Sequence, residues 1–130
     1  MKTFAHLREA IASGDAEAVW KLCATEEVYR RAYTSPRELI DEIISIVDKC
    51  DEEMLTAIGT CLLEHMLEVD FSYVFDKITN SIDSGCLPMA SCFSVCSKFG
   101  QSNEPDNSIN FDKLKEKSDA LERLTKNEIS

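Results

Sequence analysis

The chain has 130 residues and a formal net charge of −10, from 24 acidic and 14 basic side chains. This length fits one domain with an ordinary buried core, and an apolar content of 44% argues against disorder throughout. The negative charge disfavours nucleic acid and anionic membranes as partners. With four glycines and three prolines, the sequence lacks the frequent turns of a β-sandwich or barrel.

The N-terminal sequence MKTFAHLREAIASGD is amphipathic and has no apolar core of the signal-peptide type. No stretch reaches the apolar length that a membrane span requires. We therefore expect a cytoplasmic protein. We also expect its cysteines to be reduced thiols on buried helical faces, since a disulfide framework is typical of exported chains. The six cysteines are Cys23, Cys50, Cys61, Cys86, Cys92 and Cys96.

Helical periodicity and turn residues organise the first part of the chain. Gly14 and Asp15 separate two amphipathic stretches, an αα-hairpin pattern that is similar to the turn of an ankyrin repeat, although nothing recurs 33 residues on. Ser35, Pro36 and Glu38 have the spacing of a capping box with proline at the first helical position. These patterns predict helices over Thr3–Ser13, Ala16–Ala24, Thr25–Ala32 and Pro36–Asp48.

The stretch Asp51–Val69 is the longest strongly apolar segment with a clear helical period. Its apolar band is too wide for one covered side, so we place this helix at the centre of the packing. Asp51 is suited to cap it. Gly59 costs about 1 kcal/mol relative to alanine in mid-helix, and we expect a neighbouring helix to approach closely there. The apolar band consists of Met54, Leu55, Ile58, Cys61, Leu62, Met66 and Val69.

The remaining pattern predicts helices over Phe71–Ser81, Met89–Phe99 and Phe111–Leu124, the last with a thin apolar stripe. The polar segment 101–110 is expected to be a surface loop, and residues 125–130 a disordered tail. We therefore expect one all-α domain over residues 1–127, with about seven short helices. They would form an irregular bundle or a small HEAT-like or ankyrin-like α-solenoid.

No pattern of catalytic residues stands out. His65 lies on an apolar stripe and is expected at the boundary of the core. Cys86, Cys92 and Cys96 form C-x5-C-x3-C, but the second ligand pair of a zinc site is missing from the sequence nearby. Phosphate-binding glycine loops and the G-x-S-x-G and H-E-x-x-H motifs are absent. We expect no cofactor, no bound metal and no enzymatic activity.

The charge is concentrated in one region. Residues 51–90 hold eight acidic side chains and one basic side chain, −7 of the total −10. An acidic face serves solubility, or it docks a basic partner, because opposite charge speeds encounter. Large aromatic side chains dominate interface energetics, and Tyr33 precedes a loop, so we expect it to be exposed.

The segment AIGTCLLEHMLEVDFSYVFDKI, residues 57–78, resembles helices of the small α-helical immunity proteins of bacterial contact-dependent inhibition and other polymorphic toxin systems. The likeness consists of a small-residue opening, Leu-Leu-Glu, a second leucine and Asp-Phe. It implies a protein without chemistry of its own, which binds a cognate toxin domain and blocks its active site or substrate path. Many such toxins are nucleases with basic surfaces, so an acidic face would stand in for the nucleic acid.

These considerations predict a set of partner-binding residues: Glu52, Glu53, Glu64, Glu68, Asp70, Asp76, Asp83 and Tyr33. Two other functions stay open from the sequence. One is a helical-repeat adaptor that binds a peptide or a regulatory partner. The other is a small metal- or thiol-dependent enzyme.

Overall fold

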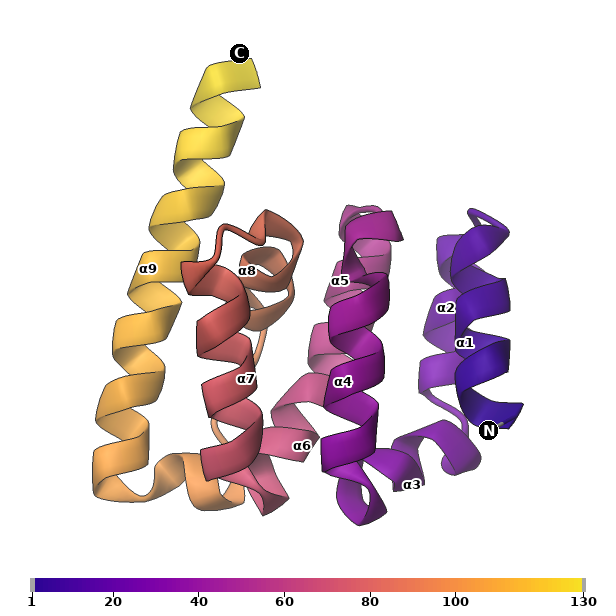
Figure 1. The fold of residues 1–130 in the computed structure, drawn as a ribbon, viewed down its shortest axis with the longest axis horizontal. Helices are drawn as coiled ribbons and strands as arrows, with labels where there is room; N and C mark the ends of the chain where they lie inside the picture. Colours follow the sequence, from indigo (N-terminus) through magenta and orange to yellow (C-terminus); the bar gives the residue numbers. More distant parts are fainter. Residues whose placement is uncertain (1, 130) are drawn as a thin grey trace.

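The computed structural model describes the backbone of residues 2–129 and the side chains of residues 5–124 (Figure 1). Within these bounds all regular structure is helical, which confirms the all-α class. The elements are α1 (Lys2–Ala12), α2 (Ala16–Cys23), α3 (Glu26–Thr34), α4 (Pro36–Ile46), η1 (Val47–Lys49), α5 (Glu52–Ile58), the π-helical η2 (Gly59–Leu63), α6 (Glu64–Val69), α7 (Phe71–Asp83), α8 (Leu87–Ser94), η3 (Gly100–Asn103) and α9 (Pro105–Ile129).

The helices form similar units stacked side by side. Each unit has two antiparallel helices and a short third one: α1–α2–α3, then α4–α5–α6, then α7–α8–η3 (Figure 1). The first helices start at residues 2, 36 and 71, and α9 starts at residue 105, so the period is 34 or 35 residues. Like packs on like: α2 on α5 and α5 on α8, α4 on α7, α3 on α6 and α6 on η3. Of the two architectures that the sequence left open, the stacked units correspond to the small solenoid.

The core shows the same period. Apolar side chains 35 residues apart occupy equivalent buried positions, and at most of these positions the residue type changes from unit to unit. The repeat is therefore a repeat of burial more than of residue identity, which is why it is hard to see in the sequence. The equivalent buried sets are Val19, Met54 and Met89; Cys23, Ile58 and Phe93; Leu39 and Val74; and Ile43 and Ile78.

The predicted central helix is formed by α5, η2 and α6, which follow one another without a break. Asp51 caps it as predicted, with its carboxylate accepting from the N–H of Met54 at 2.9 Å. A side chain at Gly59 would collide with the carbonyl oxygen of Cys92 and lie 2.6 Å from Cγ2 of Val95. The predicted close approach is therefore confirmed, and the neighbour is α8.

The sequence did not predict the π-helical turn at Gly59–Leu63. There, the N–H of Glu64 bonds to the carbonyl of Gly59, five residues back. Such a turn holds one residue more than an α-helical turn, so it rotates every later side chain about the helix axis by about 100° relative to a regular helix. The face presented by α6 therefore differs from the face that a 3.6-residue period predicts.

Residues 101–110 are a correction, because they do not form the predicted loop. They comprise most of η3 and the first turns of α9, which starts at Pro105. Proline is tolerated in a first helical turn because the N–H it lacks has no partner there. The helix predicted for Phe111–Leu124 is thus part of a 25-residue helix. The predicted disordered tail is also replaced over residues 125–129 by the end of α9, and Ser130 lies outside the described residues.

The cap predicted at Ser35 is wrong, because its side chain makes no capping hydrogen bond to α4. The side chain of Asp70, which precedes α7, makes none either. Gln101 serves the α6–α7 junction instead: its Oε1 accepts from the N–H of Phe71 at 2.9 Å, and its Nε2 donates to the carbonyl of Val69 at 2.9 Å. One side chain from the next unit therefore satisfies an N–H at one helix start and a C=O at another helix end.

Gly59→Ala should lower the free energy of unfolding by about 3 kcal/mol or more, because the contact with α8 leaves no space for a methyl group. The gain of about 1 kcal/mol in helix propensity is too small to offset this. Urea denaturation monitored by far-UV circular dichroism measures the change.

Thr60→Ala, one residue further along the same turn, is the matched control. This half-exposed position should change stability by no more than about 0.5 kcal/mol. A Gly59→Ala variant as stable as the wild type would contradict the close contact between η2 and α8.

Candidate functional site

Four rings meet at the edge of the stack formed by the short third helices. Tyr29 and Tyr33 come from α3, His65 from α6, and Phe99 from the segment that links α8 to η3. The His65 ring centroid lies 5.1 Å from Tyr29, 5.5 Å from Tyr33 and 5.4 Å from Phe99, against which it stacks. Tyr29 is 37% exposed and Phe99 is 40% exposed. We call these four residues the aromatic patch.

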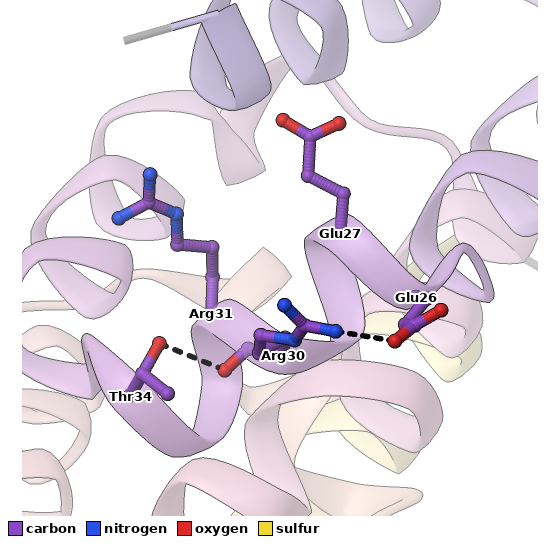
Figure 2. A pocket seen from close by; sticks show the side chains of 5 residues that line it. All are labelled: Glu26, Glu27, Arg30, Arg31 and Thr34. Carbon is purple, nitrogen blue, oxygen red and sulfur yellow. Dashed lines mark hydrogen bonds and ion pairs between the residues drawn. The ribbon is translucent and has the colours of Figure 1, made fainter.

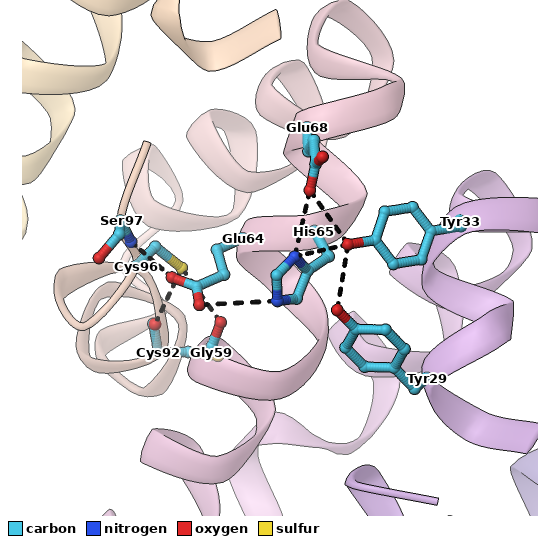
Figure 3. Close-up of polar contacts among 9 residues, drawn as sticks. All are labelled: Tyr29, Tyr33, Gly59, Glu64, His65, Glu68, Cys92, Cys96 and Ser97. Atoms are coloured by element: carbon cyan, nitrogen blue, oxygen red, sulfur yellow. Dashed lines mark hydrogen bonds and ion pairs between the residues drawn. The ribbon is translucent and has the colours of Figure 1, made fainter. Parts of the chain in front are cut away.

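The carboxylate of Glu68 lies at the centre of the polar groups in this patch (Figure 3). Its Oε1 accepts from the hydroxyl of Tyr33 at 3.1 Å and lies 3.2 Å from Nδ1 of His65. The Tyr33 hydroxyl is also 2.9 Å from that Nδ1 and 3.1 Å from the hydroxyl of Tyr29. Burial, together with hydrogen bonds to Tyr29 and Glu68, raises the pKa of the Tyr33 phenol. Tyr33 is therefore a neutral donor at neutral pH.

Glu64 is a correction, because the predicted partner-binding residue is buried. Its side chain is only 8% exposed. Oε2 accepts from the N–H of Ser97 at 2.7 Å, and Oε1 lies 3.8 Å from Nε2 of His65 (Figure 3). The π-helical turn immediately before residue 64 turns this side chain inward, toward the segment that follows α8. Glu64 therefore links α6 to the segment after α8 and is not available to a partner.

The environment of Glu64 acts on its charge in two directions. Burial raises the pKa of its carboxyl group above the ordinary value. The hydrogen bond from Ser97 and the nearby charges of His65 and Lys115 lower it, but by less. The pKa of Glu64 is therefore raised on balance.

The other predicted acidic residues do not form one face. Glu52 and Glu53 are exposed in the first turn of α5, at the edge of the stack opposite α6 (Figure 1). Asp83 is exposed at the end of α7, near that same opposite edge, and forms an ion pair with Lys117. Asp76 is exposed further along α7. The structure thus brings Tyr33, Glu64 and Glu68 together and separates them from Glu52, Glu53, Asp76 and Asp83.

Asp70 lies just beyond α6 and forms an ion pair with Arg37. Nε of Arg37 donates to its carboxylate at 2.8 Å, and the Arg37 guanidinium lies 4.5 Å from the centroid of the Tyr73 ring. Nζ of Lys77 lies 5.5 Å from that centroid. Asp70 is therefore partly neutralised, in contrast to Glu68.

Two members of the patch were not recognised in the sequence. Tyr29 and Phe99 lie within the helices predicted over Thr25–Ala32 and Met89–Phe99, where neither was singled out as a partner-binding residue, and both are exposed. For Phe99 the reason is that α8 ends at Ser94, so residues 95–99 leave the helical period. For Tyr29 a signal was present: it is four residues from Tyr33 on one helix, a spacing that puts two side chains on the same face.

The outer side of α3 carries a depression of ≈ 380 Å³ (Figure 2). All of its lining side chains are polar, with both signs of charge, and Arg30 forms an ion pair with Glu26 across one turn. An open, charged surface of this kind is well solvated. It is lined by Glu26, Glu27, Arg30, Arg31 and Thr34.

The cysteines are free, as expected. Burial raises the pKa of Cys23 to about 12 and that of Cys50 to about 11, and it raises those of Cys92 and Cys96 well above the ordinary thiol value. These four thiols are thus protonated at neutral pH, whereas a nucleophilic cysteine needs its thiolate. In the part of the chain that the structure describes, no group of three His, Cys, Asp or Glu side chains is placed to hold a metal ion.

Fold and site together define an all-α protein of stacked helical units with an aromatic patch on one edge. Comparisons with protein-family models, with curated proteins and with solved structures find no match to this chain. None of the described helices is both long and apolar enough to cross a membrane.

Glu64→Gln keeps an acceptor for the Ser97 N–H and removes the buried charge. Because the folded-state pKa of Glu64 is raised above 4.5, the folded protein binds this proton more tightly than the unfolded chain. The resulting stabilisation is fully present below about pH 4.5 and is lost as the pH rises through the folded-state pKa. The unfolding free energy of the variant minus that of the wild type should therefore grow from about pH 4.5 to 8, measured by urea denaturation.

Glu53→Gln provides the comparison for an exposed carboxylate at the other end of the same helical stretch. Because this side chain is exposed, we expect the unfolding free energy of the variant to stay within about 0.5 kcal/mol of the wild type. A Glu64→Gln difference that stays constant or shrinks with rising pH would show that the carboxylate is not destabilised by burial.

Proposed function

We propose that this chain is a non-catalytic binding protein that recognises the basic surface of another protein. The observation that carries the proposal is the aromatic patch, in which two exposed rings flank a histidine and a carboxylate on one edge of a rigid helical stack. We further propose that the partner is a bacterial toxin domain, which the chain neutralises by covering its active site or substrate path.

The patch has the composition of an interface hot spot. Tyrosine supplies a large contact area at low entropic cost, and such residues carry a disproportionate share of binding energy. Here the rings are already fixed: Tyr29, Tyr33 and His65 are held by mutual contacts and by the hydrogen bonds to Glu68. Because these side chains are ordered before binding, little conformational entropy remains to be lost on association.

Charge supports a basic partner. The chain carries −10 overall, and Glu68 lies in the patch itself. A long-range field of this sign accelerates encounter with a cationic surface, and the effect weakens as salt is added. The segment 57–78, which resembles bacterial immunity proteins, includes His65 and Glu68, so the resemblance and the patch overlap.

The helical-repeat adaptor is the second candidate, and the stacking of equivalent units favours it. Stacked repeats build extended surfaces along the stack, and such surfaces suit peptides and folded partners alike. The adaptor function uses the same edge of the stack, with the aromatic patch, but a different partner. The identity of the partner therefore distinguishes the adaptor function from the immunity function.

The first test is whether a toxin domain is encoded beside the gene for this chain; such a domain is then co-expressed with the chain in a bacterial host. The wild-type chain should restore growth and co-purify with the toxin in a stoichiometric complex. Tyr29→Ala and Phe99→Ala should each weaken binding by about 30-fold, because removing a hot-spot side chain costs about 2 kcal/mol. Calorimetry on the purified components measures the affinity.

Leu124→Ala is the control, since it removes an exposed apolar side chain on α9, away from the patch. Its affinity should stay within about two-fold of the wild type. Growth that is not restored, with no complex formed, would contradict the immunity function. A complex that tolerates both patch substitutions would place the interface elsewhere.

A further inference from the structure

We propose that the aromatic patch, together with Glu68, is a receptor for an arginine side chain. The inference rests on the proposed function for the identity of the partner, and it adds the chemical group that the patch recognises. The argument uses the rings, the carboxylate and a neighbouring site in which this chain binds an arginine of its own.

The rings offer a surface on which a guanidinium can stack. Tyr29 and Phe99 flank His65 on two sides, with centroids 5.1 and 5.4 Å from it, and both are well exposed. The negative face of an aromatic ring attracts a cation, and the planar guanidinium adds stacking that an ammonium group cannot provide. A long side chain can also cover the two exposed rings with its methylene groups.

Glu68 offers an acceptor beside the rings. Its hydrogen bonds all involve Oε1, where Tyr33 donates and Nδ1 of His65 approaches. Among the described residues nothing bonds to Oε2, and the side chain is 30% exposed. A guanidinium that stacks on the patch can therefore donate to this second oxygen, in a charge-assisted hydrogen bond.

Arg37 shows the same recognition within the chain. Its guanidinium lies 4.5 Å from the Tyr73 centroid and donates to Asp70 at 2.8 Å, so one arginine satisfies an aromatic ring and a carboxylate together. The patch contains the same pair of groups. In the described part of the chain, however, neither a lysine nor an arginine bonds to Glu68. The patch is thus a tyrosine and carboxylate site whose arginine must come from another molecule.

The test uses the full-length ¹⁵N-labelled protein and three small probes: N-acetyl-arginine methylamide, the equivalent lysine compound and the neutral isostere N-acetyl-citrulline methylamide. The arginine probe should produce saturable shifts in ¹H–¹⁵N spectra, confined to residues 29–33, 65–69 and 98–100. Citrulline should bind at least about ten-fold more weakly, because it lacks the charge, and lysine should bind less tightly than arginine because it lacks the planar fork.

Two variants and a control locate the interaction. Glu68→Gln keeps the shape and removes the charge, so the arginine probe should bind about five-fold more weakly or worse, as neutral hydrogen bonds are about half as strong. Tyr29→Leu keeps an apolar side chain and removes a ring face, and it should also weaken binding. Glu116→Gln, an exposed carboxylate on α9, should leave the affinity unchanged. Circular dichroism confirms that each variant is folded.

Equal binding of citrulline and arginine, an unchanged affinity in Glu68→Gln, or shifts centred on residues 48–53 would each overturn the inference. The outcomes also separate it from the proposed function. If the toxin is neutralised but the arginine probe does not bind, the arginine receptor is wrong and the immunity function stands. If the probe binds the patch and no toxin is neutralised, the receptor stands and the immunity function is wrong.

Discussion

The contact between Gly59 and α8 is the constraint on which the rest of the site depends. With no side chain at this position, the carbonyl oxygen of Cys92 approaches the backbone of the central helix directly. The helix passes this contact as a π-helical turn, and the carbonyl of Gly59 accepts both from the N–H of Glu64 and from the thiol of Cys96 at 3.5 Å. Every residue after this turn is rotated about the helix axis. The contact therefore decides which face α6 presents to the edge.

The rotated α6 then organises the edge from two sides. Glu64 turns into the protein and accepts from Ser97, which ties the segment after α8 to α6. Gly100 packs on the same helix so closely that a side chain there would lie 2.5 Å from Cγ of Glu68 and 2.8 Å from its carbonyl oxygen. Phe99 lies between these two attachments and is held against His65. The buried carboxylate has an energetic cost, since its pKa is raised, but it positions an exposed ring.

Local features could be predicted from the sequence, and the site could not. The cap at Asp51 depends on residues within a few positions, and the close approach at Gly59 depends on a missing side chain, so the sequence reveals both. The patch depends on the π-helical turn and on contacts between units. The spacing of apolar residues in the sequence predicts neither of them. Glu64 illustrates the consequence: a regular 3.6-residue period places it outward, whereas the structure buries it.

The period of the stack explains how the patch comes together. Tyr33 and Glu68 are 35 residues apart, as are Glu64 and Phe99. Each of these two pairs thus occupies equivalent places in successive units, and the patch runs along the stack, across the helices. In the sequence, Tyr33, Glu68 and Phe99 lie on three separate segments with no visible relation. Only the packing of α3 on α6 and of α6 on η3 turns them into one surface.

The length of this edge limits the area that a partner can cover on it. Packed helices are about 8–10 Å apart, so the three short helices of the edge span about 20 Å. A stable protein interface covers about 800 Å² on each partner, which exceeds the area of four rings. A toxin domain bound at the patch would therefore also contact adjacent surface. The adjacent surfaces are the charged depression on the outer side of α3 and the Arg37–Asp70 pair. The aromatic patch would then be the desolvated centre of the interface, and these charged groups its hydrated rim.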